Sequence, residues 1–335
     1  MTDYSHLSKN RVSIMGAAAL WIMLFHSTIN IPVTGLKVFL SLGYLGVDIF
    51  MFMSGFSMFR SYKNCCCNKK LFWLKRIKKL IPSFCIFSIV WWASYIISSY
   101  STFSDFIASI STKELCLLLI TYRWFVPAIF LCYFITPLIA QILTKLQYKP
   151  YSVFLLILFF SILALPFVLI RSSVALMILI RVPEYIIGYY YGSCGQKESN
   201  VLLRIILLSL VAVLYVFLLG RYTNDYLCDT GLYWWPAMLI ADSLSICLAR
   251  FKFISNPIFD FMGKYSLELY LWHVFIMFRL ISLFDKLGLG FDKYGLTVNV
   301  LAIVITCLFV RPYSLFVEKI SGLIFKKKRS NERIS

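Results

Sequence analysis

The sequence has few charged residues, and acidic ones are especially scarce. Only 14% of its 335 residues are charged, with 15 Asp and Glu against 33 Lys and Arg. Soluble domains carry roughly 25% charged residues, so this composition excludes an ordinary soluble protein. Hydrophobic residues make up 60% of the chain, and the mean hydropathy is +0.81. The composition therefore indicates a membrane protein.

The chain also lacks the alternation of apolar and polar residues that a membrane β-barrel requires. Its apolar runs are continuous and about 20 residues long, enough for a helix to cross roughly 30 Å of hydrocarbon. The first run is too long for a cleavable signal peptide and has no small-residue cleavage site. We expect an all-α, polytopic bundle of about ten transmembrane helices, over residues 12–31, 38–59, 80–98, 124–143, 151–170, 174–192, 201–220, 233–249, 265–282 and 296–311.

No metal-binding spacing is present among the ten cysteines. Cys65, Cys66 and Cys67 are adjacent and have no histidine nearby, so they cannot easily share one tetrahedral ion. We expect no metal site and, on the cytoplasmic side, reduced thiols.

The Lys and Arg residues gather in alternate connecting segments, by roughly three to one, as the positive-inside rule requires. The net charge of +18 is therefore read as a topology signal and not as a nucleic-acid surface. Both termini are predicted to be cytoplasmic, with a basic tail over 318–335, in a multi-pass protein of the inner (plasma) membrane. With no internal repeat and no dividing linker, residues 1–335 are predicted to form one domain.

Two ionisable residues lie within the first two apolar runs, where they are costly and therefore candidates for function. His26 is either a hydrogen-bonding packing residue or a base, because an imidazole can take and return a proton near neutral pH. Asp48, which follows Gly43 and Gly46, either hydrogen-bonds within the bundle or orients the His26 ring or a substrate. The short segment between the two runs makes them antiparallel neighbours.

Further polar positions lie in or next to the other apolar runs, and two groups of them have both a structural and a functional interpretation. The cations Lys75, Arg76, Lys78 and Lys79 either grip anionic lipid headgroups or bind phosphates, such as those of coenzyme A. Arg181 and Glu184, three residues apart, can pair as a structural clasp or a polar path. Glu268 and His273 place polar groups in another helix, where Trp272 is expected to be an interfacial anchor.

Six segments in this order resemble acyltransferase family 3 of membrane proteins: GAAALWIMLFH, GYLGVDIFMFMSGFSMF, KRIKKLIP, WFVPAIFLCYFITPL, RVPEYIIGYYYG and GKYSLELYLWH. The resemblance covers nearly the whole chain. It implies about ten helices and the transfer of an acyl group, usually acetyl, from cytoplasmic acetyl-coenzyme A to a carbohydrate hydroxyl.

By position, the resemblance implies that His26 is catalytic, and we expect Asp48 to assist it. Much of the family has an arginine eleven positions before the histidine, where this chain has Met15; Arg11, one helical turn earlier, is the nearest replacement. The predicted donor site is Arg11, Lys75, Arg76, Lys78 and Lys79, and the predicted substrate pocket is Ser54, Trp124, Arg181, Glu184 and Glu268.

The sequence thus predicts a membrane O-acetyltransferase that acts on a surface polysaccharide or a lipid-linked glycan. Acetyl-coenzyme A would be the donor, with no permanently bound cofactor; the other partners would be the carbohydrate acceptor and membrane lipids, without nucleic acid. The alternative is a transporter or flippase for a lipid-linked sugar, which the absence of an inverted repeat disfavours. A noncatalytic scaffold would leave His26 and Asp48 unexplained.

Overall fold

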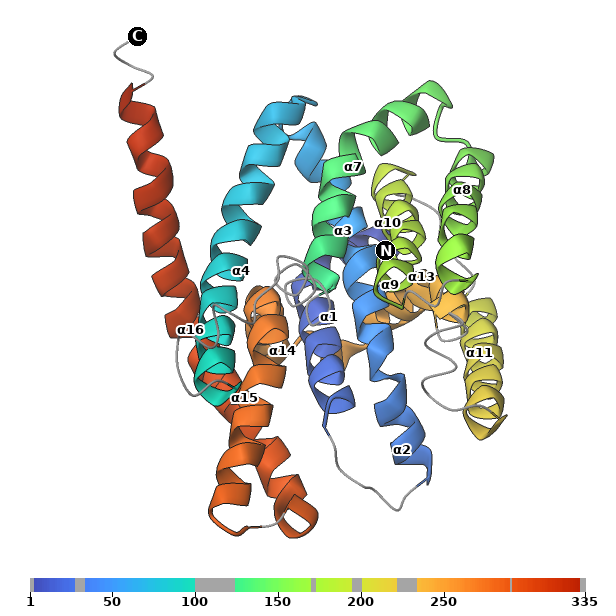
Figure 1. Ribbon diagram of the computed structural model, residues 1–335. Helices are drawn as coiled ribbons and strands as arrows, with labels where there is room; N and C mark the ends of the chain where they lie inside the picture. Colours follow the sequence, from blue (N-terminus) through green and yellow to red (C-terminus); the bar gives the residue numbers. More distant parts are fainter. Residues whose placement is uncertain are drawn as a thin grey trace. The chain divides into compact units, whose positions relative to one another are not determined.

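The computed structural model describes residues 3–27, 34–99, 124–169, 173–194, 201–221, 234–289 and 291–331, and within them every regular element is a helix (Figure 1). The elements are α1 (Asp3–Phe25), α2 (Thr34–Ser41), η1 (Leu42–Tyr44), α3 (Leu45–Lys63), α4 (Lys69–Ser99), α7 (Phe125–Lys145), α8 (Pro150–Leu169), α9 (Ser173–Leu179), α10 (Val182–Cys194), α11 (Val201–Arg221), α13 (Trp234–Arg250), η2 (Lys252–Ile254), α14 (Pro257–Lys264), α15 (Ser266–Lys286) and α16 (Phe291–Asn331).

Within the described residues, each of the ten predicted segments overlaps one or more helices and none overlaps a strand, which confirms the all-α prediction. In the described residues, seven helical stretches are long and apolar enough to cross a membrane: Phe39–Lys63, Lys69–Tyr95, Phe125–Lys145, Pro150–Val168, Val174–Ser193, Ser266–Lys286 and Gly295–Phe325. The count of ten spans and the cytoplasmic position of both termini stay predictions. The short helix α14 was not predicted.

The chain divides into two compact units whose segments interleave along the sequence. The first unit contains Met1–Phe25, Ile31–Phe72 and Trp124–Lys264, and the second contains His26–Asn30, Trp73–Arg123 and Tyr265–Ser335. A single domain over 1–335 stays a prediction.

In the first unit, α3 packs against α10 through two glycines, and Figure 1 shows the two helices side by side. A Cβ at Gly55 would lie 2.0 Å from the carbonyl oxygen of Tyr185, and one at Gly188 would lie 2.0 Å from that of Phe52. Small residues let membrane helices approach until their backbones touch. Every residue of α3 from Leu45 to Phe56 is buried, with α1, α7 and α13 packing against the helix as well.

The predicted antiparallel packing of the first two apolar runs is confirmed. Gly43 lies against Trp21, and Gly46, three residues later, lies against Ala18, three residues earlier. This order is the signature of helices that run in opposite directions.

The apolar run 174–192 is interrupted between α9 and α10, at Ile180 and Arg181. Pro183 has no N–H to donate to the carbonyl of Leu179, four residues earlier, and it disfavours helical geometry in the residue before it. The break places Arg181 at the start of α10, where the sequence had suggested the interior of one helix.

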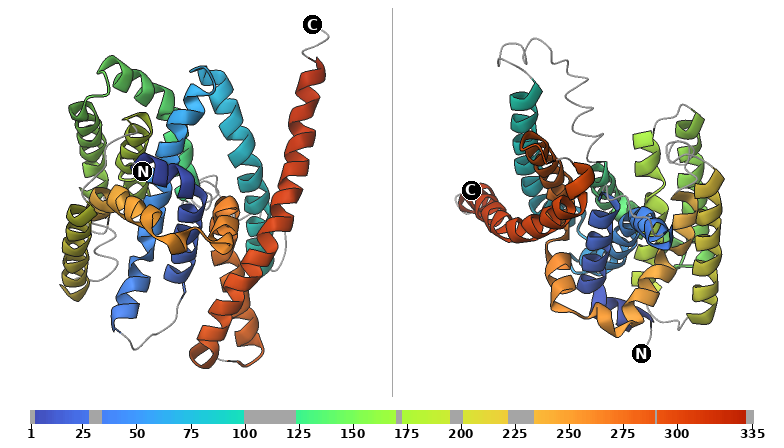
Figure 2. Two further views of the ribbon diagram at one scale, coloured as in Figure 1. Left: turned by 180° about the vertical axis from the view of Figure 1, so that it is seen from behind. Right: turned by 90° about the horizontal axis from the view of Figure 1, so that it is seen from below.

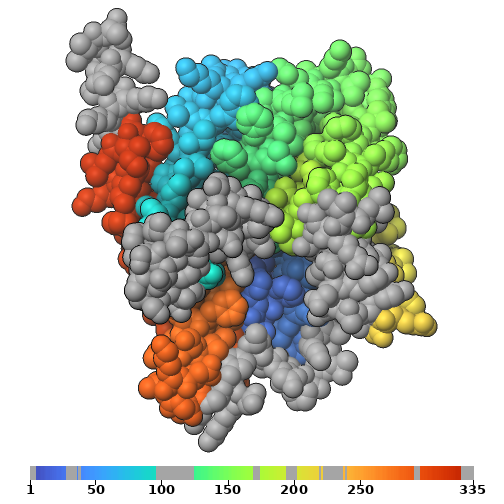
Figure 3. Space-filling model, in the orientation of Figure 1, coloured from blue at the N-terminus to red at the C-terminus, as the bar shows by residue number. Residues whose placement is uncertain are grey.

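Helix α11 lies at an edge of the first unit in both Figure 1 and Figure 2, and α7 and α8 form a neighbouring surface in Figure 3. The exposed side chains of α11 are apolar, as in Leu202 and Val213, whereas Arg204 and Tyr215 of this helix are buried. An exposed apolar helix face of this kind suits contact with lipid.

In the second unit, α4, α15 and α16 pack around Trp272 of α15. The Trp272 ring centroid lies 5.0 Å from Phe87, 4.7 Å from Phe309 and 5.1 Å from Tyr313. Such edge-on aromatic contacts add to the burial of apolar surface. The expectation that Trp272 is an interfacial anchor is therefore wrong, because the helices around it enclose its side chain.

Helix α4 continues through Pro82 because α16 takes over a hydrogen bond. Pro82 cannot donate to the carbonyl of Lys78, and the Ser321 hydroxyl of α16 donates to that carbonyl at 3.4 Å. Neighbouring side chains commonly satisfy backbone groups that a proline frees in a membrane helix. The contact joins the basic end of α4 to α16.

Candidate active site

His26 follows directly after α1, and its ring faces a second imidazole. The ring centroids of His26 and His273 lie 5.1 Å apart, with the planes tilted by 52°. Both residues belong to the second unit, where His273 is held on α15. The only other histidine in the chain is His6. The histidine predicted to be catalytic thus lies beside a second histidine.

The protonation pattern of His273 follows from its hydrogen bond. Its Nδ1 lies 2.9 Å from the carbonyl oxygen of Leu269, and because a carbonyl only accepts, Nδ1 carries the proton. The neutral ring then has its lone pair on Nε2. The side chain is 5% exposed, and Nε2 has no hydrogen-bond partner among the described residues.

A neutral imidazole next to His26 favours proton transfer there. If His26 takes a proton, its half-buried ring becomes a cation, and a nearby lone pair can stabilise that cation. From the sequence, His273 was identified only as a polar group in a helix and was not predicted to lie at the site. The feature that could have indicated this is a second histidine within an apolar run.

Four of the five cations predicted to bind the donor lie on α4 within the same unit as His26. Lys75 and Lys79 are exposed, while Arg76 and Lys78 are half-buried, and the Lys78 ammonium lies 4.8 Å from the centroid of the Phe325 ring of α16. Part of this basic end is therefore packed against protein, so lipid headgroups are not its only contact.

Glu268, predicted as a pocket residue, belongs to this end of the second unit. It interacts electrostatically with Lys79 of α4 and Glu318 of α16. Glu268 precedes His273 by five residues on α15, which is about 7.5 Å along a helix. The basic end and the imidazole pair are thus separated by about a turn and a half of α15.

Arg11, the other predicted donor residue, lies half-buried on α1 in the first unit. It precedes the end of α1 at Phe25 by 14 residues, or roughly 21 Å along the helix. Its role in holding the donor stays a prediction.

Asp48 and two of the predicted substrate-pocket residues, Arg181 and Glu184, form a buried cluster in the first unit, with the half-buried Trp124 beside it. Arg181 donates to Asp48, and its Nη1 lies 3.5 Å from Glu184, which confirms the predicted pairing of Arg181 with Glu184. The Trp124 ring centroid lies 5.6 Å from the Arg181 guanidinium. Asp48 and Arg181 are 1% exposed and Glu184 is 0% exposed.

Asp48 therefore hydrogen-bonds within the bundle, which is one of its two predicted readings. Its orientation of His26 stays a prediction, since the two residues belong to different compact units. Ser54 is buried on α3, six residues after Asp48. Glu268 belongs to the second unit, whereas the other four residues of the predicted substrate pocket belong to the first.

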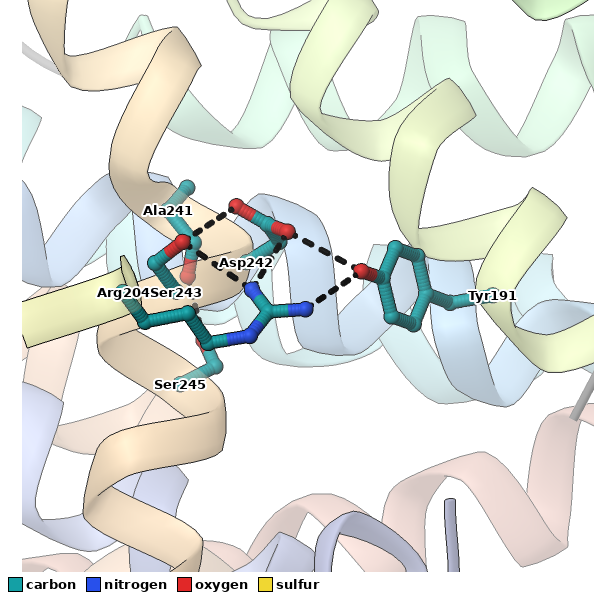
Figure 4. Close-up of polar contacts among 6 residues, drawn as sticks. All are labelled: Tyr191, Arg204, Ala241, Asp242, Ser243 and Ser245. Atoms are coloured by element: carbon teal, nitrogen blue, oxygen red, sulfur yellow. Dashed lines mark hydrogen bonds and ion pairs between the residues drawn. The ribbon is translucent and has the colours of Figure 1, made fainter. Parts of the chain in front are cut away.

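A second polar cluster in the first unit joins α10, α11 and α13 (Figure 4). Arg204 pairs with Asp242 at 2.9 Å and donates to Ser243 at 3.0 Å and to the Tyr191 hydroxyl at 2.8 Å. The Tyr191 hydroxyl in turn donates to Asp242 at 3.1 Å. One guanidinium meets one carboxylate here, so the cluster is a neutral clasp for the exposed helix α11.

In the described part of the chain, no group of three or more His, Cys, Asp or Glu side chains is placed to hold a metal ion. Cys66 and Cys67 are exposed in the turn between α3 and α4.

Comparison with known families gives one match, to an acyltransferase domain over residues 16–311, which includes His26, both buried clusters and His273. Comparisons with curated proteins and with solved structures gave no match. The matched range covers most of the chain and both compact units. The chain therefore belongs to acyltransferase family 3 and is a helical membrane acyltransferase.

Proposed function

We propose that this protein is an O-acetyltransferase of the inner (plasma) membrane. It moves an acetyl group from acetyl-coenzyme A, bound from the cytoplasmic side, to a hydroxyl of a surface polysaccharide or lipid-linked glycan. The observation that carries the proposal is the facing pair His26 and His273, in the same compact unit as the basic end of α4.

The chemistry assigned to His26 is that of a general base. An alcohol is a poor nucleophile until its proton is removed, and a positioned imidazole contributes about 10²–10⁴-fold to such a step. His26 takes the hydroxyl proton while the hydroxyl oxygen attacks the thioester carbonyl. The bond from carbonyl carbon to sulfur then breaks, and the proton on His26 passes to the departing sulfur. The reaction neither takes up nor releases a proton overall.

His273 is assigned a positioning role in this step. Its Nε2 lone pair faces no described donor, and the Nδ1 bond to Leu269 holds the ring in one tautomer. The imidazolium formed on His26 is stabilised by this neutral neighbour. Aspartate often serves this purpose beside a catalytic histidine; a neutral imidazole avoids adding a full charge to a buried place.

The donor site rests on the basic end of α4. The cations Lys75, Arg76, Lys78 and Lys79 lie within little more than one turn of one helix and suit the phosphates of coenzyme A. The offset of about 7.5 Å along α15 between Glu268 and His273 is one that the flexible pantetheine arm can cover. Arg11 is proposed as a further donor contact, and Ser54, Trp124, Arg181, Glu184 and Glu268 as contacts to the acceptor.

The test uses the full-length protein, purified in detergent and supplied with labelled acetyl-coenzyme A and a glycan extract from the host membrane. We expect release of free coenzyme A thiol and transfer of label to glycan. His26→Ala should lose both, whereas His6→Ala, the matched histidine control, should keep both. A transporter or flippase would show no acetyl-coenzyme A turnover. Retained transfer in His26→Ala at normal protein levels would refute the assignment.

A further inference from the structure

The cluster of Asp48, Arg181 and Glu184 contains two carboxyls and one guanidinium. All three side chains are at most 1% exposed. If both carboxyls were ionised, the cluster would carry a net charge of −1 in a place that has almost no contact with the surface. An uncompensated charge is strongly disfavoured in such an environment, and a carboxyl there takes up a proton instead.

No second cation compensates this charge among the described neighbours that interact with the cluster. Tyr44 of η1 and Tyr215 of α11 interact electrostatically with Arg181, and Cys132 of α7 does so with Glu184. Phenol and thiol groups are neutral near pH 7, and so is the Trp124 indole beside Arg181. The neighbours from α7, α11 and η1 therefore leave the charge count unchanged.

The hydrogen bonding of the two carboxyls also calls for a proton. With both ionised, Asp48 Oδ2 and Glu184 Oε2 have no donor within the described residues, and Glu184 Oε1 has only the Arg181 Nη1 atom, 3.5 Å away. The Asp48 and Glu184 side chains nevertheless lie within hydrogen-bonding reach of each other. Carboxylates only accept, so a hydrogen bond between them requires a proton on one of the two.

We propose that Asp48, Arg181 and Glu184 form a buried proton-binding site, in which the two carboxyls share one exchangeable proton and the cluster is electrically neutral. The ligand of this site is the proton itself. Binding converts one carboxylate into a carboxylic acid that donates to the other, while the ionised carboxyl stays paired with Arg181. The acetyl transfer proposed above is neutral in protons, so it neither consumes nor supplies the proton held at this site.

The location gives the proton a structural effect. Asp48 lies on α3 and Glu184 in the first turn of α10, next to the break that precedes this helix. The two helices touch backbone to backbone at Gly55 and Gly188. Loss of the proton places two repelling carboxylates across this helix pair, so protonation holds α3 and α10 together.

Infrared difference spectroscopy of the full-length protein in lipid nanodiscs tests the proposal directly. At neutral pH we expect a carboxylic-acid C=O absorption that shifts in heavy water and disappears in Glu184→Gln. It should disappear equally in Asp48→Asn, because the remaining carboxylate then pairs one to one with Arg181. Asp242→Asn, in the neutral clasp, should leave the absorption in place. A wild-type spectrum with no absorption that either Asp48→Asn or Glu184→Gln removes overturns the proposal.

Thermal unfolding gives a second readout that needs no spectral assignment. Each single substitution should lower Tm by less than about 4 °C, since one carboxylate still balances Arg181. The double variant Asp48→Asn with Glu184→Gln leaves a buried guanidinium without a counter-charge and should lower Tm by about 10 °C or more. Additive losses, or a large loss from either single variant, would contradict a shared proton. Acetyl transfer by wild type is scored separately, so failure of one proposal leaves the other standing.

Discussion

The imidazole of His26 lies 5.1 Å, between ring centroids, from that of His273, and the Leu269 carbonyl holds the second ring in the tautomer with its proton on Nδ1. This relationship explains why a histidine of α15 is buried with one nitrogen unpaired by any described donor. An unsatisfied buried acceptor lowers the stability of the fold, so its presence calls for an explanation. The purpose proposed here is to stabilise charge that forms on His26 during catalysis.

Substitution of His273 should therefore reduce the rate of the chemical step and leave donor binding intact. For His273→Gln we expect kcat for acetyl transfer to fall roughly 10–100-fold, below the effect of losing the base itself, with KM for acetyl-coenzyme A unchanged. Steady-state assays of purified protein measure both constants. Unchanged kcat in a folded variant would remove His273 from the mechanism, and His6→Ala serves again as the control.

The basic end of α4 should govern donor affinity. Lys75→Gln should raise KM for acetyl-coenzyme A about tenfold, because a charge-assisted hydrogen bond to phosphate is worth roughly 1.5–3 kcal/mol. Wild-type KM should also rise with ionic strength, since Lys75 and Lys79 are exposed and salt screens exposed charges.

Lys149→Gln is the matched control for that series. Lys149 is equally exposed, in the turn between α7 and α8, and lies outside the unit that holds His26. It should leave KM unchanged. An equal rise in KM for Lys149→Gln would indicate a general charge effect and count against a donor site on α4.

The close crossing of α3 and α10 should not tolerate a methyl group. In Gly188→Ala the added Cβ would lie 2.0 Å from the Phe52 carbonyl oxygen, a backbone atom that cannot turn aside. We expect a loss of about 3 kcal/mol in unfolding free energy, measured as a fall in Tm. Gly220→Ala is the control, because nothing lies within 4 Å of the Cβ that it would add. Equal Tm values for the two variants would show that the helices are not in backbone contact.

Removal of Arg204 should loosen α11. In Arg204→Gln, Asp242 loses its counter-charge and the Tyr191 hydroxyl loses a donor, so we expect a loss of roughly 3 kcal/mol. Arg221→Gln, at the exposed end of the same helix, should cost under about 0.5 kcal/mol. Thermal unfolding of the two variants side by side measures the difference. Similar small losses would show that the clasp does not stabilise the fold.

The sequence by itself determined the helices, because continuous apolar runs of about 20 residues leave few alternatives in a membrane. It also paired Arg181 with Glu184, since a spacing of three residues is a local property of a helix. Pro183 was present in the sequence, yet the break before α10 was not predicted. Membrane helices often continue through a proline, as α4 does at Pro82.

Only the tertiary structure decided which distant residues meet. Asp48 contacts Arg181, and His26 faces His273, across separations that no local period encodes. In an apolar chain the hydrophobic pattern says that polar side chains must find partners, but it does not say which ones. That choice depends on how the helices cross, and here Gly55 and Gly188 let α3 and α10 approach closely enough to bury a guanidinium between two carboxyls.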